Sequence, residues 1–150
     1  MYPKKMGLQL MLVDPDDDLR FLLKTLLELA GCQVETAKNC TEAYARIEES
    51  QPSVIFTELR LEDVTGLDFA KRIRSTPLVK DAWLIALTGH YYPGIAQDAR
   101  DAGFDRYLLK PVQYDQILNV LRLATKIRDC SLSELGCAPG ALSHQQHGHW

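Results

Sequence analysis

The sequence predicts an α/β fold in which a doubly wound, five-stranded parallel sheet is covered by helices on both faces. Five short apolar segments alternate with five segments whose apolar residues recur at helical spacing, and the connections between them are short. The segment at residues 8–13 is a continuous apolar run, which is typical of a strand buried on both faces. One domain of this kind suits a chain of 150 residues.

The composition excludes several classes of function. A net charge of -3 gives no field that would recruit nucleic acid or an acidic membrane, and no apolar run is long enough to cross a bilayer. The four cysteines show neither CxxC spacing nor an even framework, so we expect reduced thiols in a cytoplasmic protein: Cys32, Cys40, Cys130 and Cys137.

The first half of the chain predicts two strands, each followed by a helix. The strand at 8–13 leads into a helix over 17–31, which Gly31 ends. Four leucines at helical spacing form its predicted buried face: Leu19, Leu22, Leu26 and Leu29. A second strand follows at 32–37, and Asn39 with Glu42 has capping-box spacing, so we expect a helix from there to Ser50.

The second half repeats this alternation. Strands are predicted at 53–58, 82–88 and 106–110, and helices at 66–75, 94–103 and 113–129. From residue 129 the apolar periodicity stops, and we expect a flexible C-terminal tail over 129–150. Ten residues are expected to face inward from the second, third and fifth helices: Ala43, Ile47, Leu67, Ala70, Ile73, Ile117, Val120, Leu121, Ala124 and Ile127.

Polar side chains stand where four of the predicted strands end. Asp14 follows the first strand, Glu58 the third, Thr88 the fourth and Lys110 the fifth. Ligands of open parallel sheets bind beyond the carboxyl ends of the strands, at the point where the strand order reverses. Placing the two acidic strand ends side by side there predicts the strand order 2-1-3-4-5, with all four side chains at one edge of the sheet.

Over residues 6–128 the chain resembles the receiver domain of two-component response regulators, which has the CheY-like, flavodoxin-like fold. The resemblance rests on "LMLVDPDDDLRFLLKTLLELAG", "PSVIFTELRLEDVTGLDFAKRIR", "LIALTGH" and "AGFDRYLLKPV". It implies that an acidic pair and an aspartate hold Mg²⁺, and that the aspartate takes a phosphoryl group from a histidine kinase. Thr88 and Lys110 match the residues that bind the phosphoryl oxygens, Tyr107 matches the aromatic switch, and Gly66 matches the glycine of the acceptor loop.

Three positions depart from the family pattern. Glu58 stands where the family has the acceptor aspartate, Pro15 replaces the second acid, and Glu62 replaces a loop proline. Mg²⁺ prefers octahedral oxygen ligands, and phosphoryl transfer depends on positioning, so we expect Glu58 to be a poor acceptor. The remaining ligands would be Asp14, Glu58 and the Arg60 backbone carbonyl, which predicts weak Mg²⁺ binding, and Asp16 is a possible substitute acid.

These departures favour a degenerate receiver that signals by protein–protein contact without phosphorylation. A carboxylate on the longer glutamate stem should form a standing contact with Lys110 and Thr88, with Tyr107 at least partly inward. The first alternative is a receiver that is still phosphorylated, with Mg²⁺, at low efficiency. The second is a metal-dependent phosphohydrolase, which is weak because Arg60 stands where such an enzyme needs a general acid.

We expect the protein not to be an enzyme, and we expect no output domain after the receiver. The partner would be a histidine kinase or a downstream signalling protein, bound on the face of helix 94–103, strand 106–110 and helix 113–129. Tyr91 and Tyr92 border that face and are expected to be exposed. The mixed charges expected on the same face, which suit a homodimer, are Asp98, Arg100, Asp101, Arg106 and Arg122.

Overall fold

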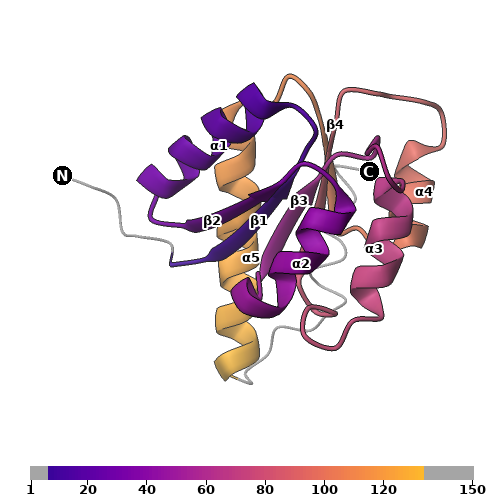
Figure 1. The fold of residues 1–150 in the computed structure, drawn as a ribbon. Helices are drawn as coiled ribbons and strands as arrows, with labels where there is room; N and C mark the ends of the chain where they lie inside the picture. Colours follow the sequence, from indigo (N-terminus) through magenta and orange to yellow (C-terminus); the bar gives the residue numbers. More distant parts are fainter. Residues whose placement is uncertain (1–6, 134–150) are drawn as a thin grey trace.

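The computed structural model describes residues 7–133, with side chains described through residue 126. Five strands and five helices alternate along the chain (Figure 1). The strands are β1 (Gln9–Val13), β2 (Gln33–Ala37), β3 (Val54–Thr57), β4 (Trp83–Thr88) and β5 (Arg106–Leu109). The helices are α1 (Asp17–Leu29), α2 (Cys40–Ser50), α3 (Gly66–Arg74), α4 (Ile95–Ala102) and α5 (Tyr114–Ser133).

The strands form one parallel sheet in the order β2-β1-β3-β4-β5, which confirms the predicted fold and strand order. The register aligns the carboxyl ends: Val13 pairs with Ala37 and with Thr57, and Thr88 pairs with Leu109. The loops that leave these ends therefore meet at one edge of the sheet, where parallel α/β folds place their ligands.

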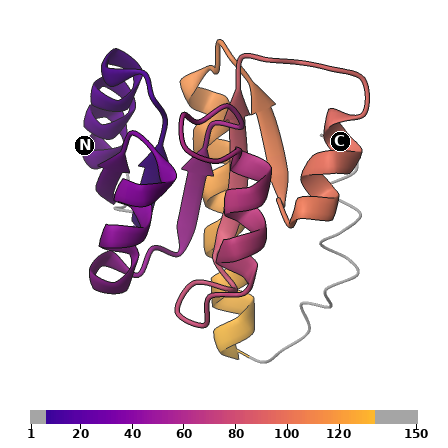
Figure 2. The same ribbon diagram turned by 45° about the vertical axis from the view of Figure 1, so that its right-hand side comes forward.

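Helices cover both faces of the sheet (Figures 1 and 2). On one face α1 and α5 pack with Leu10, Leu12 and Phe56, and on the other α2, α3 and α4 pack with Met11 and Ile55. Successive strand residues alternate between these two clusters because side chains of a strand point to opposite faces. In the described part of the chain, no helix is long and apolar enough to cross a membrane.

The predicted buried face of α1 is wrong. Leu23 and Leu27 are its buried residues, whereas Leu22 is 53% exposed and Leu29 is 77% exposed. The helix carries six leucines in eleven positions, so more than one stripe has helical spacing. Leu23 and Leu27 lie four residues apart on the side that meets the sheet, and this choice depends on tertiary packing.

The residues predicted to face inward from the other helices agree more closely with the structure. Of the ten predicted, all but two are buried: Leu67 is only partly buried, and the side chain of Ile127 lies outside the described residues. Phe69, which the prediction missed, is fully buried in α3. The predicted surface position of Arg106 is wrong, since this side chain is only 1% exposed.

Helix α5 extends to Ser133, four residues past its predicted end at Asp129. No glycine or proline occurs between these two residues, so nothing in the local sequence stops the helix there. The predicted flexible tail from residue 134 onward lies outside the described residues.

Candidate functional site

The site residues are each held one position beyond the end of a strand. The backbone N–H of Asp14 donates to Ala37, that of Glu58 donates to Val13, and that of Lys110 donates to Thr88, at 3.0, 2.9 and 2.9 Å. These bonds continue the sheet ladder by one residue, so the backbone that carries each side chain is fixed by its neighbouring strand.

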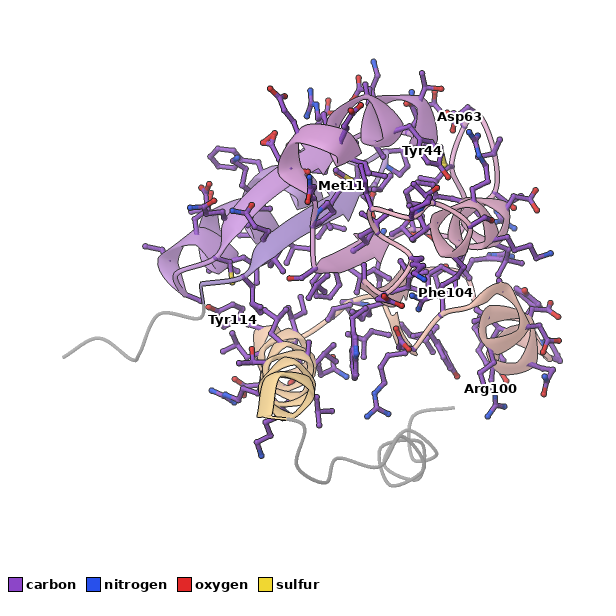
Figure 3. All side chains as sticks on the ribbon, turned by 90° about the horizontal axis from the view of Figure 1, so that it is seen from below. Met11, Tyr44, Asp63, Arg100, Phe104 and Tyr114 are labelled. Carbon is purple, nitrogen blue, oxygen red and sulfur yellow. The ribbon has the colours of Figure 1, made fainter. Side chains whose placement is uncertain are left out.

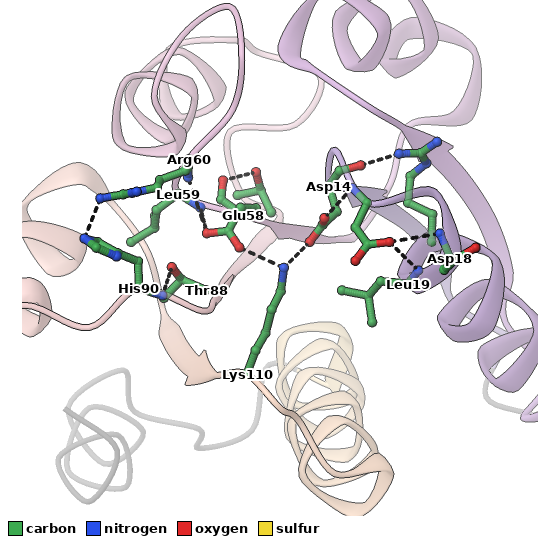
Figure 4. Close-up of polar contacts among 12 residues, drawn as sticks. Asp14, Asp18, Leu19, Glu58, Leu59, Arg60, Thr88, His90 and Lys110 are labelled. Atoms are coloured by element: carbon green, nitrogen blue, oxygen red, sulfur yellow. Dashed lines mark hydrogen bonds and ion pairs between the residues drawn. The ribbon is translucent and has the colours of Figure 1, made fainter.

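The ammonium group of Lys110 lies between the carboxylates of Asp14 and Glu58 (Figure 4). Its Nζ atom is 2.6 Å from Oδ2 of Asp14 and 2.8 Å from Oε2 of Glu58. Asp14 is 1% exposed and Glu58 is 7% exposed, so both negative charges are largely removed from water. Carboxylates so deeply buried need a partner, and one cation supplies it to both.

The second carboxylate oxygen of Glu58 is bound by the loop that follows it. Oε1 accepts hydrogen bonds from the backbone N–H of Leu59 at 2.8 Å and of Arg60 at 3.3 Å. Burial raises the pKa of Glu58, but hydrogen bonds from Lys110 and Thr88, the Lys110 charge and the Arg60 N–H lower it further, and the net shift is downward. The glutamate therefore stays ionised at neutral pH and has both oxygens engaged.

The surroundings of Lys110 favour the charged form of its ammonium group. Burial lowers the pKa of its ammonium group, and the hydrogen bonds and charges of Asp14 and Glu58 raise it by more, so the net shift is upward. Lys110 and Glu58 consequently stabilise each other's charged form. A neutral amine at this position is excluded at physiological pH.

Asp14 is held by the start of α1 as well as by Lys110. Its Oδ1 atom accepts a hydrogen bond from the backbone N–H of Asp16 at 2.9 Å. Its backbone carbonyl accepts from Nη1 of Arg20 at 2.5 Å. The Arg20 contact was not predicted. Its one signal in the sequence is that Arg20 follows Asp14 by six residues.

The Asp16 side chain caps α1 and does not act as a substitute metal ligand beside Asp14 and Glu58. Its Oδ1 atom caps α1, accepting from the backbone N–H of Asp18 at 3.0 Å and of Leu19 at 3.1 Å. Across residues 7–126 no three His, Cys, Asp or Glu side chains group closely enough to hold a metal ion. The carboxylates of Asp14 and Glu58, both bound to an ammonium group, do not by themselves fit Mg²⁺.

Thr88 and Tyr107 lie on β4 and β5 next to the site. Thr88 is fully buried, and its hydroxyl oxygen accepts the backbone N–H of His90 at 3.1 Å. Tyr107 is half-buried and packs against the core cluster on the side of α2, α3 and α4. Its backbone pairs with Ala86 of β4, two residues before Thr88.

Gly66 allows the acceptor loop to close against β3. Its N–H donates to the carbonyl of Leu59 at 2.8 Å. A Cβ atom at this position would lie 2.5 Å from the carbonyl oxygen of Glu58 and 2.7 Å from Cα of Leu59. Any larger residue would push the start of α3 away from the loop that orients Glu58.

An unpredicted contact joins the loop that follows β3 to the loop that follows β4 (Figure 4). Nη2 of Arg60 lies 2.5 Å from Nε2 of His90. A guanidinium group can only donate, so Nε2 of His90 is the acceptor in this contact. The pair borders a hollow of about 270 Å³ next to Thr88. The side chains of Arg60 and His90 were not among those predicted to form the site.

Asp63 anchors the acceptor loop to the start of α2, a role that was also not predicted. Its carboxylate accepts from the backbone N–H of Cys40 at 3.2 Å, and from the N–H and the hydroxyl of Thr41, both at 2.9 Å. Burial opposes ionisation, but these hydrogen bonds lower the pKa of Asp63 to about 2. Asp63 is labelled in Figure 3, and its partners Cys40 and Thr41 begin α2.

Comparison with known proteins is consistent with this geometry. A family model described as "Response regulator receiver domain" matches residues 10–122. An uncharacterized 14.6 kDa protein from the sodA1 3' region of Leptolyngbya boryana is 30% identical over 115 residues, which span 77% of this chain and 88% of that protein. Protein PilG of Pseudomonas aeruginosa is 29% identical over 118 residues, spanning 77% and 86%. The structure of the chemotaxis response regulator CheY4 of Vibrio cholerae has a TM-score of 0.73 and 26% identity, covering 79% of this chain and 98% of that one.

Proposed function

Because this chain belongs to the response regulator receiver domain family of two-component systems, we propose that it is a receiver that signals by protein–protein contact without phosphorylation at Glu58. Receivers are in general signalling modules rather than enzymes, and they interact with histidine kinases and downstream effectors. In this chain the ion pair between Lys110 and Glu58 takes the place of phosphorylation.

The main observation behind this proposal is that Lys110 binds both buried carboxylates, those of Asp14 and Glu58. Its Nζ atom contacts Asp14 and Glu58 at 2.6 and 2.8 Å. Both oxygens of Glu58 are engaged, one by Lys110 and one by the N–H groups of Leu59 and Arg60. An acceptor needs a free oxygen aligned with the incoming phosphorus, and breaking these bonds to provide one would leave a buried charge unpaired.

Mg²⁺ binding should be weak for the same reason. Receivers in general bind Mg²⁺ at the phosphorylation site, but here Pro15 supplies no carboxylate and Asp16 caps α1. A divalent cation would have to displace the ammonium of Lys110 from Asp14 and Glu58. This geometry supports the proposal that the ammonium group of Lys110 takes the place of a bound metal ion.

The same contact supports a switch that is biased in advance. In the family, the phosphoryl group draws the threonine toward the acceptor and lets the aromatic ring turn inward. Here the Glu58 carboxylate accepts a hydrogen bond from Lys110, Thr88 helps to lower the pKa of Glu58, and Tyr107 is half-buried. A carboxylate carries one charge where a phosphoryl group carries nearly two, so it holds only part of the activated arrangement.

The output surface that we propose is the face of α4, β5 and α5, where a partner or a second copy would bind. A hollow of about 570 Å³ lies beside β5 on this face, and Leu109 is 40% exposed there. Tyr91, in the loop that leads to α4, is 61% exposed, whereas Tyr92 is half-buried and donates to Asp98 at 2.9 Å. Arg106 adds no surface charge, because it is buried.

We also place the protein in the cytoplasm. Cys32 and Cys40 are buried free thiols, and burial is the main reason why the pKa of Cys40 is raised to about 12. Buried thiols that are protonated at neutral pH are unreactive and suit a reducing compartment.

Labelling with radioactive acetyl phosphate and Mg²⁺ tests this function. The wild type and Glu58→Asp should remain unlabelled, because Pro15 still denies the metal its ligand. Glu58→Asp combined with Pro15→Asp should restore labelling. Acid-stable and base-labile label on the wild-type chain, which is the signature of an acyl phosphate, would instead favour a receiver that is phosphorylated at low efficiency.

A further inference from the structure

Strand β2 lies at one edge of the sheet and pairs only with β1 (Figure 1). A free strand edge presents unpaired backbone N–H and C=O groups, to which a strand of another molecule can add. Edge strands are commonly protected by a lysine, a proline or a bulge of their own. The sequence of β2, QVETA, has no lysine, arginine or proline, and its register with β1 runs from Gln33 to Ala37 without a bulge.

The pairing with β1 decides which backbone groups of β2 face outward. The N–H of Gln33 and the carbonyl of Ala37 both bond to residues that flank β1, at 2.8 and 3.0 Å. Along a strand, successive residues direct their backbone groups alternately to one side and to the other. Residues 33, 35 and 37 therefore face β1. Val34 and Thr36 direct both N–H and C=O away from the sheet.

Two cations from the flanking helices bind the outward carbonyls of β2. Nζ of Lys24, on α1, donates to the carbonyl of Val34 at 2.9 Å, and Nη1 of Arg46, on α2, donates to the carbonyl of Thr36. Helices α1 and α2 pack on opposite faces of the sheet, so the two side chains reach the edge from both sides. Each outward carbonyl of β2 thus has a donor from its own chain.

The space beside this edge is a hollow of about 620 Å³, lined by residues of α1, β2 and α2. An added strand would lie in this hollow, about 4.8 Å from β2. Lys24 and Arg46 both line it, so their side chains occupy the place that such a strand needs. Since exposed carbonyls can also bond to water, these two contacts add little to the stability of one molecule, but an incoming strand has to displace them.

A second copy of this chain matches the edge in one register. Two β2 strands related by a twofold axis at Glu35 run antiparallel, with Val34 of each opposite Thr36 of the other. Antiparallel residues in this position exchange both N–H···O=C bonds, so the two pairs use every outward backbone group. The two Glu35 side chains would lie opposite each other, and like charges in that position oppose pairing.

We propose that the β2 edge is a pairing surface for a second copy of this chain, and that Lys24, Arg46 and Glu35 keep it closed. The cations block the carbonyls that pairing requires, and the glutamates repel each other across the twofold axis. None of these three residues belongs to the site around Glu58, so this surface is independent of the signalling role proposed above.

The test compares the full-length wild type with the variant Lys24→Met, Arg46→Met. Methionine keeps an unbranched apolar stem but donates no hydrogen bond. Light scattering over a concentration series should show that the double variant associates at concentrations about tenfold lower than the wild type, or lower still. In the associated form, amide hydrogen exchange at Val34 and Thr36 should slow about tenfold or more, because their outward N–H groups become bonded.

Two further variants identify the contact. Lys71→Met with Lys80→Met removes the same charge from exposed positions elsewhere and should leave association as in the wild type. Thr36→Pro, added to the double variant, removes one outward N–H at an edge where proline is tolerated, and should restore the wild-type state. Thermal unfolding checks that each variant is folded, and the single variants Lys24→Met and Arg46→Met should each show a smaller change in the same direction.

Three outcomes would overturn the proposal. The first is a folded double variant that associates no more readily than the wild type. The second is an association that Thr36→Pro leaves intact, which would place the contact on another surface. The third is slow exchange at Val34 and Thr36 in the dilute wild type, which would mean that another segment of this chain already covers the edge.

Discussion

The Nζ atom of Lys110 lies 2.8 Å from Oε2 of Glu58, across the ends of β5 and β3. The two residues are 52 positions apart in the sequence, and β4 separates their strands in the sheet. The contact is therefore a product of the fold, and the same ammonium group also neutralises Asp14. In a receiver, this is the place where the phosphoryl group and its cation meet.

Replacing Lys110 with methionine should lower the free energy of unfolding by about 3 kcal/mol at pH 7, because two buried carboxylates lose their cation. The pKa of Glu58 is lowered in the fold, so its pairing stabilises the protein above the unfolded pKa and is lost as pH falls through the folded value. The deficit of Lys110→Met should accordingly shrink below about pH 4.5.

Urea unfolding of Lys110→Met at pH 7 and pH 4 measures this effect, with Lys80→Met, a change at an exposed lysine, as the matched control. A deficit that is the same at both pH values would mean that Lys110 does not hold the Glu58 carboxylate ionised.

Asp63→Ala should destabilise the protein by about 1 kcal/mol, the usual cost of losing a helix cap. The variant loses the hydrogen bonds from Cys40 and Thr41 and frees the acceptor loop from α2. The pKa of Asp63 is lowered to about 2, so its contribution is complete above about pH 4 and disappears as pH falls toward 2. Thermal unfolding from pH 7 to pH 2 would check this, with Glu62→Ala as the control in the same loop; equal deficits for the two variants would refute the anchoring role.

Arg74→Ala should cost about 2–4 kcal/mol, since one guanidinium group donates hydrogen bonds to several partly buried acceptors. It donates to the carbonyls of Gly103 and Ala82 at 2.9 and 2.6 Å, and to the Asp105 carboxylate at 2.9 Å. Chemical denaturation should show this loss, whereas Lys71→Ala on the exposed side of α3 should be neutral within about 0.5 kcal/mol. A loss below about 1 kcal/mol for Arg74→Ala would mean that water satisfies these carbonyls.

The sequence was sufficient to predict the sheet and the meeting of Asp14, Glu58 and Lys110. These predictions depend on period and topology: apolar runs define strands, and parallel strands bring their carboxyl ends to one edge. The N-cap at Asn39 was equally predictable, because its carboxamide oxygen accepts from the backbone of Glu42 at 2.9 Å, a contact three residues long.

Features decided by tertiary packing were not predictable. The leucines of α1 have helical spacing on several sides, and only the position of the sheet selects Leu23 and Leu27. Arg106 occupies a position that sequence alone assigns to the surface, yet it is buried at the start of β5. Asp63 caps a helix that begins 23 residues earlier, and no local pattern signals a cap at that distance.

The most direct test of the central claim is a pair of ¹H–¹⁵N spectra of the wild-type chain, without and with beryllofluoride and Mg²⁺, which together mimic a phosphorylated aspartate. The internal contact of Glu58 with Lys110 predicts no change at the backbone signals of Thr88, Gly89 and Lys110, whereas Glu58→Asp with Pro15→Asp should shift all three. Saturable shifts of these signals in the wild type, at concentrations similar to those needed by the double variant, would contradict a receiver that works without phosphorylation.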